Sequence, residues 1–523
     1  MKKAITIRLF GVLAVFGLFI GLAGCATEPA ENNTSVGENE FLLSSLPELE
    51  PFEAFTDISS RYYEEYTDKL LASDEYGRLY PYPGKVLHSS WMNETRYGLC
   101  DAQGRIVLDP VCTYISIQSF DAGVEIMQLS YAPTSATEED MSSYESINNV
   151  AYAAVDGSWV VDDCPGYLMY ADEEVFIIGG VDYDDTYIYT TNYVYNMADG
   201  TLRSQFPMSQ LVAYQKDMLI IGERGADGNT GYRLTDYDGN TIRELECTNA
   251  VLCGEQIIVA NANGLWGITD LAGNYLVEPQ YQYISSTTTP GDSKYFCADT
   301  VAGTTQLITA DGQIVLDIAS GANISSVNDE KYPDLYYVRE YGQSLSYLID
   351  VSTGDQGLVT EDSIEYIGNG WYAISNYENK LTIYKWGQNE PWAEISDDAY
   401  LNSWCELLQG TENILSIQVS ALDDNDNYSN YTILYDLSSR SEIATIDGVY
   451  SSYIDAGEGY TFWNSNSGSY SIYDAEGNLL RNTGFTYLNK VDDGHYTVAN
   501  NLYGGVVDGN GKWLIRIYIN TLD

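Results

Sequence analysis

Short apolar segments alternate with polar turns along most of the chain. The pattern is clearest in three fifteen-residue segments that align without gaps, Glu94–Leu108, Asn263–Val277 and Asn501–Ile515. In each one, an apolar run ends at an aspartate, a glycine follows three residues later, and a second apolar run begins after it. A glycine in such a turn supplies a positive φ, and the two runs then leave antiparallel to each other. The pattern predicts a series of β-hairpins.

The three segments share one set of signature positions: a glycine in the first run, the aspartate that ends this run, and the turn glycine. These residues are Gly98, Asp101 and Gly104, then Gly267, Asp270 and Gly273, and finally Gly505, Asp508 and Gly511. The first two segments also continue alike. Pro110 and Pro279 end the second strand, because proline cannot donate to a central ladder. Tyr114-Ile115 and Tyr283-Ile284 then follow at the same spacing.

Fainter copies of the same turn extend the repeat to about eleven units. From Gly104 to Gly511 there are 511 − 104 = 407 residues, which over ten intervals gives about 41 residues per unit. Units of this length with three or four short strands are typical of β-propeller blades. We therefore expect an all-β, propeller-like repeat with one or two rings. Because a propeller usually has roughly four to eight blades, an open superhelical array is the alternative.

One copy resembles a known family. The stretch Gly264–Asp270, followed by Glu278-Pro279, is similar to the repeat of bacterial WG-repeat proteins, and Trp266-Gly267 matches the pair that names it. The tryptophan position holds Tyr97 in the first segment and Gly504 in the third. The resemblance implies a repeat protein, often exported, with no general enzymatic activity and no catalytic residues to carry over.

The amino terminus has the order of an export signal. Lys2, Lys3 and Arg8 precede or open an uncharged stretch that runs from Leu9 to Thr27. Leu22-Ala23-Gly24-Cys25 resembles the lipobox of bacterial lipoproteins. This resemblance implies that residues 1–24 are a cleaved signal peptide and that a lipidated Cys25 anchors the protein outside the cytoplasm on the cell membrane. An uncleaved transmembrane anchor is the alternative, since about 18 apolar residues can span a bilayer.

Three regions follow the signal. Residues 25–57 are expected to form a flexible tether, because Ala26–Glu40 is rich in Glu and Asn and nearly free of apolar residues. Residues 58–84 are expected to form a helix and a lead-in segment, since Ile58, Tyr62, Tyr66 and Leu70 recur every four residues. The β-repeat region is placed at 85–523. Within it, a strand around 85–91 is a candidate to complete the last unit and close the ring.

The charge balance removes several classes of partner. Lys plus Arg is 24 and Asp plus Glu is 76, a formal net charge of −52. So negative a chain is repelled by phosphate backbones and anionic lipid headgroups, so we expect no nucleic-acid binding and membrane contact through the lipid anchor only. A hydrophobic content of 45% argues against disorder.

Few residues suggest catalysis or a cofactor. Only two histidines are present, His88 and His495, and no GxSxG context accompanies them. Asp423, Asn425 and Asn427 alternate as weak calcium candidates in an otherwise cofactor-free sequence. An EF-hand would need Gly and Glu where Tyr428 and Leu434 stand, so an acidic loop that only aids solubility is the alternative.

The seven cysteines after Cys25 show no CxxC spacing, which speaks against zinc or redox chemistry. Cys247 and Cys253 are close enough in sequence to bridge a hairpin. The sequence leaves open whether they do.

The aromatic residues are the strongest binding signal. Trp371, Trp386, Trp392 and Trp404 lie close together in sequence and could form an exposed patch or pack between sheets. We expect a non-enzymatic binding module for an unknown envelope protein or glycan. A carboxylate-based glycan hydrolase would instead hold two facing carboxylates, one with a raised pKa, and a structural envelope protein would have a uniformly acidic surface.

Overall fold

The computed structural model describes residues 77–518 except for short gaps. The gaps are 89–92, 121–122, 132–148, 163, 165, 184–187, 208, 225–229, 288–293, 377–379, 397–399, 423–427, 455–458, 465–466, 493, 501–502 and 510. The predicted signal peptide, Cys25, the tether and the helix begun at Ile58 lie outside the described residues, and so do Asp423, Asn425 and Asn427.

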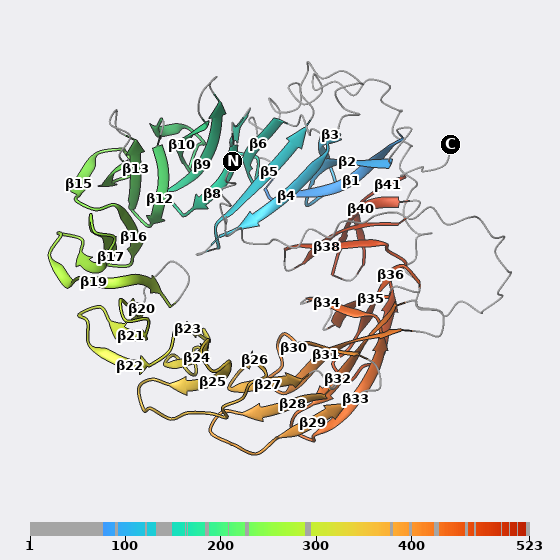
Figure 1. Cartoon of the computed structure of the whole chain (residues 1–523). Coiled ribbons are helices and arrows are strands. Elements are labelled where there is room, and N and C mark those ends of the chain that lie inside the picture. Colours follow the sequence, from blue (N-terminus) through green and yellow to red (C-terminus); the bar gives the residue numbers. More distant parts are fainter. Residues whose placement is uncertain are drawn as a thin grey trace, which may run out of the picture. The chain divides into compact units, whose positions relative to one another are not determined.

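The described residues form forty-one strands in ten antiparallel sheets, and within every sheet the strands follow one another in chain order (Figure 1). The first four sheets are β1 (Leu79–His88), β2 (Asn93–Asp101) and β3 (Ile106–Cys112); β4 (Tyr114–Ser119), β5 (Glu125–Tyr131), β6 (Asn149–Ala154) and β7 (Val160–Val161); β8 (Gly166–Ala171), β9 (Val175–Tyr183), β10 (Ile188–Asn196) and β11 (Leu202–Phe206); and β12 (Ser209–Gln215), β13 (Met218–Arg224), β14 (Thr230–Thr235) and β15 (Thr241–Leu245).

The fifth sheet has seven strands: β16 (Asn249–Cys253), β17 (Gln256–Ala260), β18 (Trp266–Asp270), β19 (Tyr275–Ser286), β20 (Tyr295–Thr300), β21 (Thr305–Thr309) and β22 (Ile314–Ile318). The sixth has three: β23 (Ala322–Ser326), β24 (Leu335–Glu340) and β25 (Leu345–Asp350).

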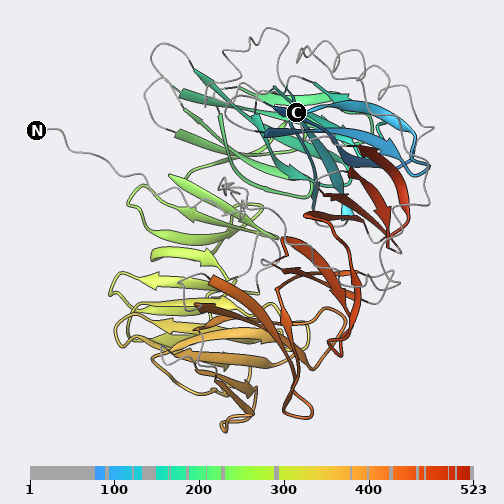
Figure 2. The same ribbon diagram turned by 90° about the vertical axis from the view of Figure 1, so that its right-hand side faces the viewer.

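The last four sheets have four strands each (Figure 2). They are β26 (Ser363–Gly368), β27 (Trp371–Asn376), β28 (Lys380–Lys385) and β29 (Ala393–Ser396); β30 (Tyr400–Leu407), β31 (Ile414–Leu422), β32 (Tyr428–Asp436) and β33 (Ser441–Asp447); β34 (Val449–Ile454), β35 (Gly459–Asn464), β36 (Ser469–Tyr473) and β37 (Leu479–Asn482); and β38 (Tyr487–Asp492), β39 (His495–Ala499), β40 (Tyr503–Asp508) and β41 (Trp513–Tyr518).

The seven-stranded sheet consists of two repeat units that share the long strand β19. The first part of β19 pairs with β18 and its second part pairs with β20. Counting this sheet as two gives eleven units in the described chain, which we number in chain order, so that β1–β3 form unit 1 and β38–β41 form unit 11. The predicted all-β repeat of about eleven units is confirmed, and its order of short antiparallel strands is propeller-like.

The second strand of a typical unit is apolar on both faces, because it is covered by a neighbouring unit on each side. In β9, Val175 and Ile177 pack toward unit 4, whereas Phe176 and Ile178 pack toward unit 2. Alternate side chains of a strand point to opposite faces of its sheet, so a continuous apolar run is what such a position requires.

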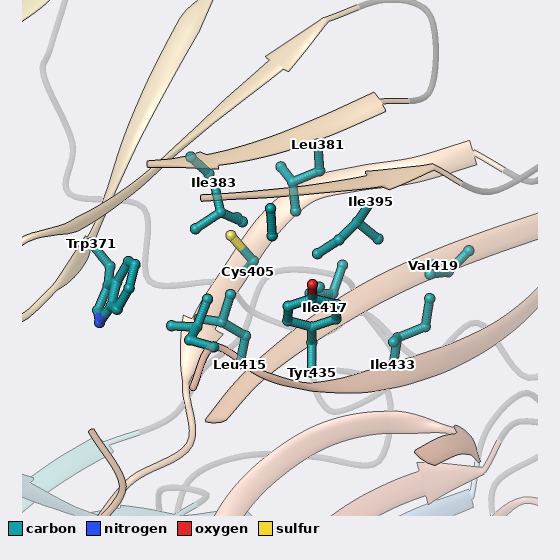
Figure 3. Close-up of a cluster of buried hydrophobic side chains, with 13 residues drawn as sticks. Trp371, Leu381, Ile383, Ile395, Cys405, Leu415, Ile417, Val419, Ile433 and Tyr435 are labelled. Atoms are coloured by element: carbon teal, nitrogen blue, oxygen red, sulfur yellow. The ribbon is translucent and has the colours of Figure 1, made fainter. Parts of the chain in front are cut away.

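Eleven buried clusters join the eleven units, each between two consecutive units. Figure 3 shows the largest one, where Trp371, Leu381 and Ile383 of unit 8 meet Leu415 and other residues of unit 9. Ten clusters would suffice for an open array of eleven units. The eleventh contains Tyr80, Tyr82 and Cys100 of unit 1 together with Val506, Ile515 and Ile517 of unit 11. The interfaces therefore form one closed cycle, which favours a single propeller-like array over two rings or an open one.

This closing interface is made by packing and not by strand exchange. The strand predicted around 85–91 belongs to β1, which begins earlier, at Leu79, and pairs with β2, while unit 11 has four strands of its own. The predicted completion of the last unit is therefore wrong. The outward edge of β1 is closed: Leu79 N donates to the Val155 carbonyl (2.8 Å), and Thr497 Oγ1 donates to the Pro81 carbonyl (2.6 Å). Pro83 points the same way and has no N–H to offer another strand.

Consecutive units share one edge of the array. In a four-stranded unit, antiparallel order makes the first and third strands begin at the same edge of the sheet. Unit 1 lacks a first strand, so β1, β2 and β3 correspond to the second, third and fourth strands of the other units. Most connections between units are short, with Thr113 alone between β3 and β4, and the longer one, Val351–Asp362, runs back along β25 through the bridges Ile349–Gln356 and Ser346–Thr360. The next first strand therefore begins at that edge too. We call this the start edge, and the opposite one, which carries the hairpin turns between third and fourth strands, the turn edge.

Candidate binding surface

The first signature glycine is required by a close approach of two strands. A Cβ atom on Gly98 would lie 2.4 Å from the Leu108 carbonyl oxygen, and one on Gly267 would lie 2.5 Å from the corresponding oxygen of Val277. On Gly505 the distance to the Ile515 oxygen would be 2.0 Å. The three glycines thus occupy one structural position, where the fourth strand leaves no room for a side chain.

The signature aspartates and turn glycines build the hairpin at the turn edge. In the turn of unit 5, Gly273 N donates to the Asp270 carbonyl (3.1 Å), and the Asp270 carboxylate accepts from Asn274 N (2.8 Å). Asp101 with Gly104, and Asp508 with Gly511, make the same turn, and all three glycines have positive φ. These bonds stabilise a glycine-bulge turn, so the aspartates serve the fold.

Each turn also rests on the preceding unit. A Cβ on Gly273 would lie 2.4 Å from Arg243 of β15, and one on Gly477 would lie 2.3 Å from Ala444 of β33. Gly104 of unit 1 has the equivalent neighbour in unit 11, since its Cβ would lie 2.0 Å from the Leu514 carbonyl oxygen. The first and last units therefore meet in the same manner as internal neighbours.

The start edge carries exposed tyrosines at one recurring position. Each stands immediately before an inward-facing aliphatic residue of a first strand. They are Tyr114 (47% exposed), Tyr167 (59%), Tyr283 (49%) and Tyr487 (40%). A solvent-exposed tyrosine in a repeated position is not needed for the core and offers a ring face and a hydroxyl group to a ligand.

Two of these tyrosines stand at equivalent positions, each beside an aromatic residue on the third strand of the preceding unit. Trp266 and Tyr283 lie edge to face, with ring centroids 5.3 Å apart. At the same spacing, Tyr114 lies near Tyr97, and the pKa of the Tyr97 phenol is raised by burial and by Tyr114. Trp266 and Tyr97 also have equivalent strand partners, Tyr281 and Cys112. The pairs Trp266/Tyr283 and Tyr97/Tyr114 thus stand at the same place in two units.

Tyr487 of unit 11 lies across the closing interface from Tyr97 and Tyr114 and adds a third tyrosine to this pair. Burial raises the pKa of its phenol strongly, and Tyr97, Tyr114 and Tyr470 add to this effect. The ring nevertheless keeps 40% of its surface exposed. Both observations fit a side chain that is surrounded by neighbours but open to solvent on one side. Units 10, 11, 1 and 2 therefore contribute tyrosines to one part of the start edge.

Three of the four clustered tryptophans, by contrast, pack between sheets. Trp371 is 5% exposed and meets Trp392 edge to face at 5.4 Å. Trp392 Nε1 donates to the Leu437 carbonyl (2.7 Å), and the Lys385 ammonium lies 4.0 Å from the centre of the Trp371 ring. Trp386 packs partly buried against the cluster between units 7 and 8, and the side chain of Trp404 lies outside the described residues. The exposed-patch interpretation fails for Trp371.

Two carboxylates lie close together on neighbouring first strands. Glu365 of β26 is partly buried, which raises its pKa to about 7 against a contribution from the Cys405 amide that lowers it, and Glu406 of β30 adds to the increase. Burial also raises the pKa of Glu406. No sequence pattern indicated this pair, because the two residues come from different units.

The remaining candidates whose side chains the structure describes have structural roles, and the side chain of His88 lies outside that part. His495 Nδ1 lies 2.9 Å from Asp492 Oδ1, and Tyr80 covers its ring. The seven cysteines after Cys25 are all thiols, so Cys247 and Cys253 form no bridge, and burial raises the pKa of Cys112 to about 12. Within the described ranges, no three His, Cys, Asp or Glu side chains gather as a metal site, and no helix is long and apolar enough to cross a membrane.

Several solved structures resemble the fold at low similarity. The designed protein Ika8 is 12% identical, over 60% of this chain and 93% of that chain, with a TM-score of 0.29. BamB from Moraxella catarrhalis is 14% identical, over 60% and 92%, with a TM-score of 0.27. The β-propeller domain of Cps50 (Swd1) from Myceliophteria thermophila is 14% identical, over 51% and 98%, with a TM-score of 0.24.

No protein-family model and no curated protein matches the chain. The TM-scores are too low to carry an argument, so the architecture rests on the sheet order and the interfaces described above.

Proposed function

We propose that the chain is a lipid-anchored, extracytoplasmic protein of the WG-repeat type that binds an envelope protein or a glycan and catalyses no reaction itself. The start edge is its contact surface. The recurrence of exposed tyrosines at one position of the first strands carries this proposal, since the core does not require them there.

The signature residues support a scaffold role. Gly98, Gly267 and Gly505 are explained by strand packing, and the aspartates by turn geometry. Because these signature positions serve the fold, recognition is left to exposed side chains that the fold does not require, such as the recurring tyrosines.

Capture experiments test the binding role. Residues 26–523 would be applied to a glycan array and to envelope-protein extracts, beside a variant that carries Tyr114→Ser and Tyr283→Ser. We expect capture of one ligand class, lost in the variant. If the protein captures no ligand from the glycan array or from the envelope-protein extracts, the proposed contact surface is wrong. It is also wrong if the variant captures every ligand as well as the parent does.

The anchor is tested separately. Metabolic labelling with a fatty-acid analogue should mark the protein, and Cys25→Ser should abolish both the label and the membrane association. An unlabelled protein that stays in the membrane would point to the uncleaved helix instead.

A glycan hydrolase is the second candidate, favoured by Glu365 and Glu406. A carboxyl group with a pKa near 7 is suited to donate a proton to a leaving group. Turnover of a glycan that is lost in Glu365→Gln, with the fold intact, would establish this role. Glu406→Gln should then also abolish turnover.

A further inference from the structure

The two aromatic pairs of the start edge occupy equivalent positions in their units. Tyr97 and Tyr114 are 17 residues apart (114 − 97), and so are Trp266 and Tyr283 (283 − 266). In both, the first aromatic stands beside a signature glycine on a third strand, and the second begins the buried part of the next first strand. A repeated pair of rings, one partly buried and one exposed, offers the same contact twice to a ligand.

The chemistry of the pairs favours a sugar. Tyrosine and tryptophan rings offer flat apolar faces that pack on the C–H face of a pyranose, and their O–H and N–H groups can bond its hydroxyls. Tyr114 and Tyr283 are each about half exposed, which leaves ring surface to be covered by a ligand. Only one partner of each pair is held in place by the core: Trp266 packs against the cluster within the seven-stranded sheet, and Tyr97 packs against the cluster between units 1 and 2.

The net charge of the protein favours an uncharged sugar as the ligand. With a net charge of −52, the protein repels acidic polymers, and the penalty grows with their length. Neutral glycans carry no such penalty.

We infer that the pairs Tyr97/Tyr114 and Trp266/Tyr283 are two copies of one subsite for a neutral glycan of repeating structure. This rests on the proposed function and specifies its ligand. Two identical subsites on one chain match a ligand that repeats, because a polymer can occupy both and the second contact is then intramolecular.

Affinity electrophoresis in gels that contain a polysaccharide tests the inference. The probes are a neutral β-glucan, neutral galactomannan, soluble chitin oligomers and acidic polygalacturonate. The variants are Tyr114→Ser, Tyr283→Ser and the double substitution. Tyr275→Ser is the matched control, because Tyr275 is 44% exposed on the same strand as Tyr283 and lies outside the pair.

We expect at least one neutral polymer to retard the protein and polygalacturonate to leave it unaffected. Each single substitution should weaken the apparent affinity for the polymer about tenfold or more, and the double substitution should abolish retardation, since avidity requires both subsites. A short oligomer of the same sugar should lose only about half of its binding sites in each single variant. Tyr275→Ser should behave as the parent.

Retardation by no neutral polymer, or equal retardation of the parent and the double variant, overturns the inference. If a protein from the envelope is then captured in a manner that depends on Tyr114 or Tyr283, the proposed binding function stands and only the ligand class is wrong. Failure of both experiments removes the proposed function as well. Circular dichroism of every variant establishes that the fold is retained.

Discussion

Two interfaces that join neighbouring units differ in their chemistry. One lies between units 8 and 9, and the other is the closing interface between units 11 and 1. The first has thirteen buried apolar residues, whereas the second has six. Arg78 adds a polar contact near the closing interface: its guanidinium pairs with Glu125 of unit 2 and lies 3.3 Å from Asp492 of unit 11. The closing interface, which has fewer buried apolar residues, is thus supplemented by charged contacts among units 1, 2 and 11.

The two interfaces also titrate in opposite directions. Between units 8 and 9, Glu365 has a raised pKa of about 7, so its contribution to stability is present at low pH and is lost as the pH rises through 7. At Asp492, burial alone would raise the pKa, but the Gly494 amide, His495 and Tyr80 outweigh it and hold the pKa below 3.8. Its contribution is present above that value and is lost as the pH falls further. The contributions of these two carboxyl groups to the stability of their interfaces therefore depend on pH in opposite directions.

The largest expected effect comes from the apolar side of this comparison. Ile417→Ala, at a fully buried position between units 8 and 9, should lower the free energy of unfolding by about 3 kcal/mol. Ile515→Ala in the closing interface should cost less, because fewer apolar neighbours surround the cavity. Denaturant unfolding of both variants gives the comparison, and an equal cost would show that the closing interface is packed as well as the internal one.

Glu365→Gln should stabilise the protein at high pH. At pH 8 the carboxylate is charged and partly desolvated, and its removal should raise the free energy of unfolding by on the order of 2 kcal/mol. At pH 5 the parent is already protonated, so the two proteins should be alike. Urea unfolding at both pH values measures this, and a pH-independent difference would mean that Glu365 does not titrate near 7.

Arg78→Gln should weaken the closing interface by roughly 1 to 2 kcal/mol at pH 7. The substitution leaves Glu125 and Asp492 without their common cation. The pKa of Asp492 lies below its usual value of 3.8, so the part of the difference that is due to Asp492 should be lost only as the pH falls further below that value. Thermal melts across the pH range provide the measurement, and an effect that persists in acid would point to lost packing and not to lost charge.

The smallest effect is expected at an exposed ion pair. Lys331 and Glu412 lie 3.1 Å apart with more than half of each side chain exposed. Lys331→Ala should change the free energy of unfolding by less than about 0.5 kcal/mol, because water screens the pair. A larger cost in the same denaturant assay would show that unit 7 depends on this contact.

Local chemistry made part of the fold predictable. The Asp-x-x-Gly spacing identified the hairpins around Asp101, Asp270 and Asp508, because the turn is determined by a few adjacent residues. The closing of the cycle was not predictable in the same way. Sequence placed a strand near Lys85 but did not reveal its partner, since pairing depends on which distant strand lies alongside.

The candidate surface was partly visible as well. The equal spacing of Tyr114-Ile115 and Tyr283-Ile284 was a signal, but only the exposed fractions show that the tyrosines point outward. The clustered tryptophans misled for the opposite reason. A high density of tryptophans along the sequence does not show whether they lie on the surface or between two units. Trp371 is buried.

The closed cycle has a consequence for synthesis. Tyr80, Tyr82 and Cys100 are among the first residues of the array to emerge, while Val506, Ile515 and Ile517, which cover them, are among the last. Until translation of the chain is nearly finished, unit 1 presents an apolar face with no neighbour, and such faces promote aggregation. We therefore expect the chain to be most prone to aggregation during the interval in which its first and last units have not yet met.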